Sequence, residues 1–173
     1  MNRPVARETA PQGPEPATAR TDYTGAVYGS LLAASVVATA GAAGEFPRLQ
    51  LVVLLLVTGL VFWAAHVYAR LAGERFVGQA TPWSEVRMVA RHEWSIVEAA
   101  TLPAAAIALG AVFGLDLDTS GWIALGVAVA QMVGWSCLGA RKAGASRRQV
   151  VLEGLVNLVL GLVIVAAKGA LSH

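Results

Sequence analysis

The chain has 173 residues, of which 56% are hydrophobic and only 14% are charged. This composition excludes an ordinary water-soluble domain, in which about 25% of residues are charged. With 13 Lys and Arg against 11 Asp and Glu, the formal charge of +2 leaves no basic surplus for binding nucleic acid. The single cysteine, Cys137, excludes an internal disulfide. The sequence is therefore typical of a membrane protein.

The first 22 residues are set apart from the rest of the chain by proline and charge. Pro4, Pro11, Pro14 and Pro16 stand among arginines and acidic residues. Such a composition cannot bury enough apolar surface to offset the entropy lost on ordering. We therefore predict that residues 1–22 form a disordered tail on the cytoplasmic side of a membrane.

Five apolar stretches follow the tail, and they cover residues 23–43, 49–69, 94–114, 121–140 and 149–170. Each approaches the roughly 20 residues that a helix needs to cross about 30 Å of hydrocarbon. Residues 51–57 are an uninterrupted run of leucine and valine, which does not fit the alternating pattern of a β-barrel strand. The sequence thus predicts an all-α, polytopic bundle of five transmembrane helices over residues 23–170.

The first of these stretches contains Ala38-Thr39-Ala40, which imitates a signal-peptidase site. A signal peptide carries a net positive segment before its apolar run, whereas here Glu8 and Glu15 precede it. The sequence favours a retained first helix, with cleavage as the alternative.

Lysine and arginine are distributed asymmetrically, and positively charged loops remain in the cytoplasm. With a cytoplasmic N-terminus, the cytoplasmic side collects Arg3, Arg7, Arg20, Arg70, Arg75, Arg87, Arg91, Arg141, Lys142, Arg147 and Arg148. Only Arg48 and Lys168 fall on the other side. We predict a cytoplasmic N-terminus and an external C-terminus. The preference for arginine over lysine and the abundance of alanine indicate a high-GC bacterial genome, so we expect the bacterial plasma membrane.

A short extra helix is predicted in the longest connection between these stretches. Thr81-Pro82 provides a capping side chain followed by a proline at the first helical position. Beyond it, apolar residues share one helical face, and Arg87 and Arg91 lie on the other. We predict an amphipathic helix at 82–92 in the cytoplasmic headgroup region. A solvated linker helix is the alternative.

Ionisable residues inside a membrane span are functional candidates, because each must be neutralised, paired or hydrated. His66, Glu98 and Glu153 are expected at one depth in the cytoplasmic third of the bilayer, with Gln131 and Asn157 about a turn deeper. A histidine beside a carboxyl can share a proton with it, because imidazole titrates near neutral pH and desolvation raises a carboxyl pKa. These five residues are the candidates for an ion or proton path. We favour the alternative, in which they hydrogen-bond the helices together or reach the interface.

Small residues recur at helical spacing in the fourth stretch. Gly126, Ala130 and Gly134 form a small-x-x-x-small ladder, and Gly110 and Gly114 form a Gly-x-x-x-Gly at the end of the third stretch. Such surfaces let helices approach closely, either within one chain or between copies. The expected partners are therefore the lipid bilayer and either a second copy or another membrane protein.

Motifs for catalysis and cofactor binding are incomplete. His92-Glu93 begins like a zinc-protease helix, but Ile96 stands where the second histidine must be. Ser136 lies between glycines as in a nucleophile elbow, yet Gly139 comes one residue too late and the context is a continuous helix. We expect no enzymatic activity, no metal site and no bound cofactor.

Three strings carry a resemblance: FWAAHVYAR at 62–70, EWSIVE at 93–98 and GLVNLVLGLVIV at 154–165. They resemble small five-helix integral membrane proteins of high-GC Gram-positive bacteria. The resemblance covers nearly the whole chain after the tail and implies a membrane location. It brings no activity, ligand or functional residue with it. The iron-transporting five-helix family shares only the helix count, because 23–43 contains no carboxylate.

Two functions follow from the sequence. The favoured one is an accessory or structural component of the plasma membrane, in which the polar layer fixes the helices. The alternative is a small proton- or cation-linked transporter or channel. In it, His66 and Glu98 form the titrating pair, and Glu153, Asn157 and Gln131 line the path.

Overall fold

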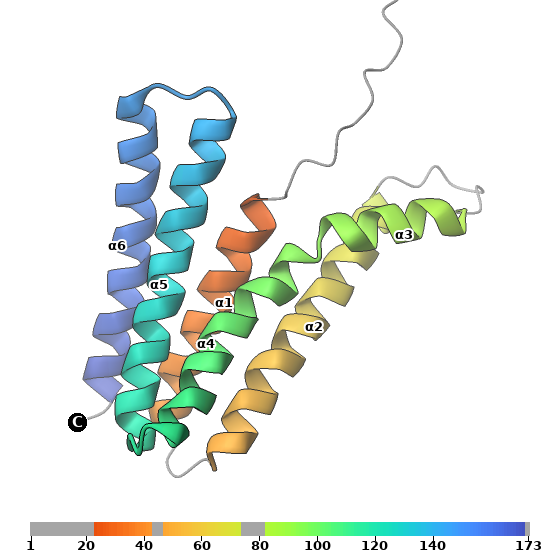
Figure 1. The fold of residues 1–173 in the computed structure, drawn as a ribbon. Coiled ribbons are helices and arrows are strands. Elements are labelled where there is room, and N and C mark those ends of the chain that lie inside the picture. Colours follow the sequence, from red (N-terminus) through yellow and green to blue (C-terminus); the bar gives the residue numbers. More distant parts are fainter. Residues whose placement is uncertain (1–22, 43–46, 74–81, 172–173) are drawn as a thin grey trace, which may run out of the picture.

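Figure 1 shows the fold in a computed structural model, which describes residues 23–42, 47–73 and 82–171. The helices are α1 (Tyr23–Ala42), α2 (Arg48–Gly73), α3 (Trp83–His92), α4 (Ser95–Val112), α5 (Leu117–Lys142) and α6 (Arg147–Leu171). Five segments are long and apolar enough to cross a membrane, with α3 and α4 together forming one of them. The prediction of an all-α chain with five such helices is confirmed. The chain is a multi-pass membrane protein.

The helix ends differ from the predicted ones by several residues. The second predicted span reached residue 69, whereas α2 continues to Gly73. The fourth was expected from residue 121, but α5 begins at Leu117 because Asp116 caps it. The predicted tail over 1–22 lies outside the described residues.

Two turns that join neighbouring helices are closed by glycines with positive φ, Gly114 at 68° and Gly144 at 79°. After α4, the N–H of Leu115 donates to the carbonyl of Gly110 at 2.9 Å. The same bond pattern follows α5, and it satisfies carbonyl groups that the end of a helix leaves unpaired. A side chain would be strained at either glycine, because this backbone region favours residues without a Cβ.

The helices that follow these turns begin with side-chain caps. The carboxylate of Asp116 accepts the N–H of Thr119 at 2.7 Å. Before α6, the N–H of Ser146 donates to Gln149 Oε1 at 2.8 Å, and the N–H of Gln149 donates back to Ser146 Oγ at 3.4 Å. Reciprocal bonds of this kind form a capping box. Together the glycines and caps make α4, α5 and α6 consecutive antiparallel neighbours.

Helix α1 is the centre of the bundle and contacts α2, α4, α5 and α6. It packs through small side chains, among them Ala33, Ala34 and Val37, which are almost fully buried. At Gly29 a Cβ would lie only 2.8 Å from the carbonyl oxygen of Ile96, so α1 and α4 touch through their backbones. The small residues that make α1 weakly apolar are therefore the ones that allow its close packing.

Helices α2 and α6 lie at opposite edges of the bundle (Figure 1). Many of their leucines and valines are exposed, including Leu60 and Val163. In water such surfaces would be unfavourable, but in a bilayer they face hydrocarbon of similar polarity.

Helix α3 runs sideways at the end of α2, across the direction of α5 and α6 (Figure 1). The predicted position of its proline is wrong by one residue. Pro82 has an extended backbone, with φ −66° and ψ 143°, and precedes the first helical residue, Trp83. Thr81 lies outside the described residues, so the predicted cap there is untested.

Candidate functional site

Of the predicted path, His66 lies in the interface between α2 and α1. Its ring centroid is 4.9 Å from that of Tyr28 on α1, and its Nδ1 is 3.1 Å from the carbonyl oxygen of Phe62. Phe62 also contacts Tyr28, edge to face at 6.3 Å between centroids. Phe62 and His66, four residues apart on α2, thus both pack against Tyr28 of α1.

The two acidic residues of the predicted path lie on other faces of the bundle. Glu98 is exposed on α4, and Glu153 is exposed on α6. Helix α6 lies at the edge opposite to α2, which carries His66. The residues were grouped by their depth along the helices, but the structure gives them different directions around the bundle axis.

Gln131 and Asn157 also make separate contacts. The Oε1 atom of Gln131 is buried and accepts no hydrogen bond from the described residues. Asn157 donates its Nδ2 to the backbone carbonyl of Glu153 at 2.9 Å, within α6. Across the described ranges, no hydrogen bond or ion pair joins the side chains of two of the five predicted residues.

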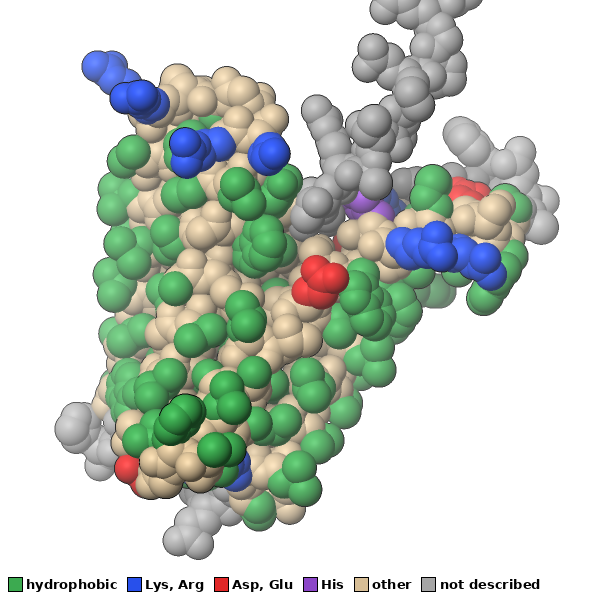
Figure 2. All heavy atoms as spheres, in the orientation of Figure 1, with side chains coloured by type: hydrophobic (Ala, Val, Ile, Leu, Met, Phe, Trp, Pro, Cys, Tyr) green, Lys and Arg blue, Asp and Glu red, His purple; other side chains and the backbone are tan. Residues whose placement is uncertain are grey.

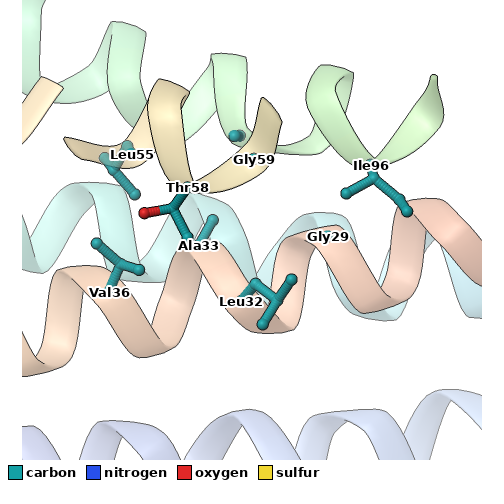
Figure 3. Close-up of a pocket in the computed structure, with 9 residues that line it drawn as sticks. Gly29, Leu32, Ala33, Val36, Leu55, Thr58, Gly59 and Ile96 are labelled. Carbon is teal, nitrogen blue, oxygen red and sulfur yellow. The ribbon is translucent and has the colours of Figure 1, made fainter. Parts of the chain in front are cut away.

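A small pocket lies between α1, α2 and α4 (Figure 3). It is lined by Gly29, Leu32, Ala33, Val36, Leu55, Thr58, Gly59, Ile96 and Ala100. Thr58 brings a hydroxyl, which points into the space between α2 and α1 in Figure 3. The volume of about 10 Å³ is close to the smallest that holds one water molecule. None of the five predicted residues lines this pocket, and its size excludes a metabolite in this conformation.

Arg48 makes the most extensive polar contact of the described chain. Its Nη1 donates to the carbonyl of Ile107 at 2.7 Å and to Ser120 Oγ at 2.8 Å, and its Nη2 donates to the carbonyl of Leu115 at 2.5 Å. The guanidinium therefore ties the start of α2 to the end of α4 and to the start of α5. A cation is favourable at the C-terminal end of a helix, where carbonyl groups are unpaired. We call this contact the Arg48 clasp.

The sequence interpretation missed the clasp because it counted Arg48 only as a loop charge. The position of Arg48 was one sequence signal for the clasp. Arg48 is the first residue of α2, where the helix dipole disfavours a cation, so its charge needs hydrogen-bond acceptors elsewhere in the fold. Gly110 gives it room, because a Cβ there would overlap Ser120 Oγ and lie 2.9 Å from Arg48 Nη1.

Lys168 is the second basic residue at this end of the bundle, and its side chain is only 2% exposed. Its Nζ lies 3.5 Å from Asp118 Oδ1 and 4.9 Å from the ring centroid of Trp122. A carboxylate and an aromatic face both attract an ammonium group. Both basic residues of this end are thus engaged inside the fold.

At the opposite end, polar and aromatic contacts attach α3 to α2. Arg70 Nη1 lies 2.6 Å from Glu93 Oε1, and the Glu93 side chain is 6% exposed. Trp63 donates its Nε1 to the carbonyl of Ala90 at 2.8 Å and packs against Trp94 at 5.4 Å between ring centroids. These contacts fix the direction of α3 relative to the bundle.

The exposed basic side chains gather at the end that carries α3. Figure 2 shows Lys and Arg on α3 and around the turn between α5 and α6. The exposed residues are Arg70, Arg87, Arg91, Arg141, Lys142, Arg147 and Arg148. Arg75, which was assigned to the same side, lies outside the described residues. Accessible positive charge is therefore concentrated at one end of the described bundle.

Comparison with protein families, with curated proteins and with solved structures finds no match to this chain. Of the resemblance to small five-helix membrane proteins, the structure therefore supports only the five apolar spans of this chain.

Proposed function

We propose that the protein is an accessory or structural component of a bacterial plasma membrane, without enzymatic activity of its own. The observation that carries this proposal is where the buried and half-buried charges lie. Arg48, Lys168 and Glu93 each join two parts of the fold. Glu98 and Glu153, by contrast, are exposed on separate helices.

An ion path needs polar groups that follow one another through the interior of a bundle. Among the described residues, the buried Glu93 and Lys168 and the half-buried Arg48 lie near helix ends and already have polar partners, so they stabilise the arrangement of the helices. Glu98 follows the start of α4 by three residues, and Glu153 follows the start of α6 by six. At about 1.5 Å per residue, their carboxylates can reach the headgroup region.

The proposed orientation puts the α3 end in the cytoplasm and the Arg48 end outside. Its support is the concentration of exposed lysine and arginine at the α3 end (Figure 2). Positive charge near the ends of spans is retained on the cytoplasmic side during insertion.

The alternative proposal is a proton- or cation-linked transporter or channel that uses His66, Glu98 and Glu153. Two observations favour this transport role over a purely structural role for the polar residues of the predicted path. His66 lies in an interface between helices, and Gln131 Oε1 is buried without a hydrogen-bond partner among the described residues.

Flux through purified protein separates the two proposals. The full chain is reconstituted in liposomes that contain a pH-sensitive dye, and a potassium diffusion potential drives proton entry. We expect the same proton leak as in protein-free liposomes, and a membrane protein partner that co-purifies in stoichiometric amount in mild detergent. Proton entry that Glu98→Gln abolishes while the variant remains folded would establish the transport proposal instead. A Glu85→Gln variant on α3 is the matched control.

A further inference from the structure

Helix α3 exposes two unpaired arginines one helical turn apart. Arg87 and Arg91 are both exposed, and neither forms an ion pair with another described residue. Their i, i+4 spacing places the two guanidinium groups on the same face of the helix. Each offers a planar set of donors that fits phosphate oxygens in pairs.

Large apolar side chains are exposed on the same short helix. Trp83 is 72% exposed and Met88 is 64% exposed. Tryptophan is enriched at the level of lipid headgroups, where its ring meets both acyl chains and water. A helix with this mixture of exposed arginine and apolar side chains fits the boundary between headgroups and hydrocarbon.

The direction of α3 is fixed by its contacts with α2. Glu93 pairs with Arg70, and Ala90 accepts the Trp63 indole N–H. Val89 is buried in the same interface. Since α3 runs across the direction of the long helices (Figure 1), it can lie along a membrane surface while α4 crosses the bilayer. In that position the arginines would lie at headgroup depth.

We propose that α3 is a binding surface for anionic phospholipid, in which Arg87 and Arg91 bind the headgroup phosphate and Trp83 and Met88 contact the adjoining acyl chains. This inference rests on the membrane location of the chain and is independent of the accessory role. It predicts selectivity for phosphatidylglycerol over phosphatidylcholine, because only the former brings a net negative charge to the two arginines.

The test is a lipid titration of the purified full chain in a neutral, mild detergent, read as bound lipid by native mass spectrometry. We expect phosphatidylglycerol to bind more tightly than phosphatidylcholine. The double variant R87Q/R91Q should lose about tenfold or more in affinity for phosphatidylglycerol, since each arginine near an anionic surface contributes several-fold. R87K/R91K keeps the charge and should lose less. Inorganic phosphate should not compete, because it lacks the acyl chains.

The matched control is R147Q/R148Q, which removes two exposed arginines from the start of α6. It should leave the selectivity for phosphatidylglycerol unchanged. Equal affinity of the wild type for the two lipids would overturn the proposal, and so would an equal loss in R147Q/R148Q and R87Q/R91Q. Competition by inorganic phosphate would show a soluble anion site and would also overturn it. If R87Q/R91Q does not fold, R87K/R91K decides: retained selectivity for phosphatidylglycerol with less than about a tenfold loss in affinity supports the proposal, and a loss of all selectivity contradicts it.

Discussion

The two ends of the bundle use basic side chains in opposite ways. At one end, Arg48 donates to three oxygens and Lys168 is buried beside Asp118 and Trp122. At the other end, the arginines of α3 and those around the turn between α5 and α6 are exposed (Figure 2). The same residue type is thus structural at one end and accessible at the other.

This difference sets apart the two exceptions to the charge asymmetry of the sequence. Arg48 and Lys168 are the basic residues that the proposed orientation places outside. Both make polar contacts within the fold, Arg48 with three oxygens and Lys168 with Asp118. Neither side chain is therefore free to bind headgroups at that end. Among the described residues, exposed positive charge lies at one end, which is the asymmetry on which the proposed orientation rests.

The largest expected effect comes from breaking the Arg48 clasp. Arg48→Met leaves the hydroxyl of Ser120 and the two carbonyls without their charged donor. The free energy of unfolding should fall by about 3 kcal/mol, because hydrogen bonds to a charged group contribute about 1.5–3 kcal/mol each and do not add fully. Unfolding in mixed micelles by titration with dodecyl sulfate measures it. Arg147→Met at the exposed end should change it by less than about 0.5 kcal/mol, and equal losses would remove the distinction between the ends.

Two glycine substitutions, one beside the clasp and one away from it, test the packing around Arg48. Gly110→Ala should lower the free energy of unfolding by about 2 kcal/mol, because overpacking a filled site costs about 1–3 kcal/mol. The new methyl group would push Ser120 and Arg48 apart. Gly134→Ala is the control, because a Cβ at that exposed position of α5 meets nothing within 4 Å. We expect Gly134→Ala to be neutral or slightly stabilising, and the same unfolding titration compares the two. A tolerated Gly110→Ala would argue against the clasp.

At the exposed end, one basic residue is paired. Glu93→Gln weakens the contact with Arg70, which attaches α3 to α2. The free energy of unfolding should fall by only about 1 kcal/mol, because Arg70 is partly open to solvent. Detachment of α3 from α2 should be a clearer sign that the contact is lost, and it should appear as faster cleavage by trypsin at Arg87. Glu85→Gln is the control for cleavage, and equal rates in both variants would contradict the role of the pair.

The smallest effect concerns the cap of α5. The backbone N–H of Thr119, and then its hydroxyl, lower the pKa of Asp116 below the ordinary value of 3.8. Since the folded pKa is lowered, this cap stabilises fully above the ordinary pKa and is lost as the pH falls through the lowered value. Asp116→Ala should therefore lower the thermal midpoint at pH 7 and reduce its dependence on pH below about 4. Asp116→Asn keeps a capping oxygen and should retain most of the midpoint. A pH dependence unchanged in Asp116→Ala would contradict this assignment.

The spans could be predicted from the sequence because their length and apolar character are properties of each stretch by itself. The candidate site could not, because counting residues gives depth but not direction. His66 is in an interface, since it and Phe62 both contact Tyr28. Glu98 is not, because the buried face of α4 carries Ile96 and Ala100 instead. Which face of α4 is buried depends on how the small residues of α1 let the helices approach.

The Arg48 clasp was beyond sequence reasoning for a related reason. Its acceptors, Ile107, Leu115 and Ser120, are separated from Arg48 by 59 to 72 residues. Only the packing of α2 against α4 brings them within reach. By contrast, the caps at Asp116 and Ser146 join residues three positions apart, so the local sequence is sufficient to predict them.

A pair of reporter fusions tests most directly the claim that the end with exposed basic residues faces the cytoplasm and the clasp end faces outside. Alkaline phosphatase is active only outside the cytoplasm. It is fused after His173, and separately inserted between Gly144 and Ala145 in the turn between α5 and α6. The account predicts an active enzyme in the first fusion and an inactive one in the second. A silent but stably produced fusion after His173, together with activity at the turn, would contradict it.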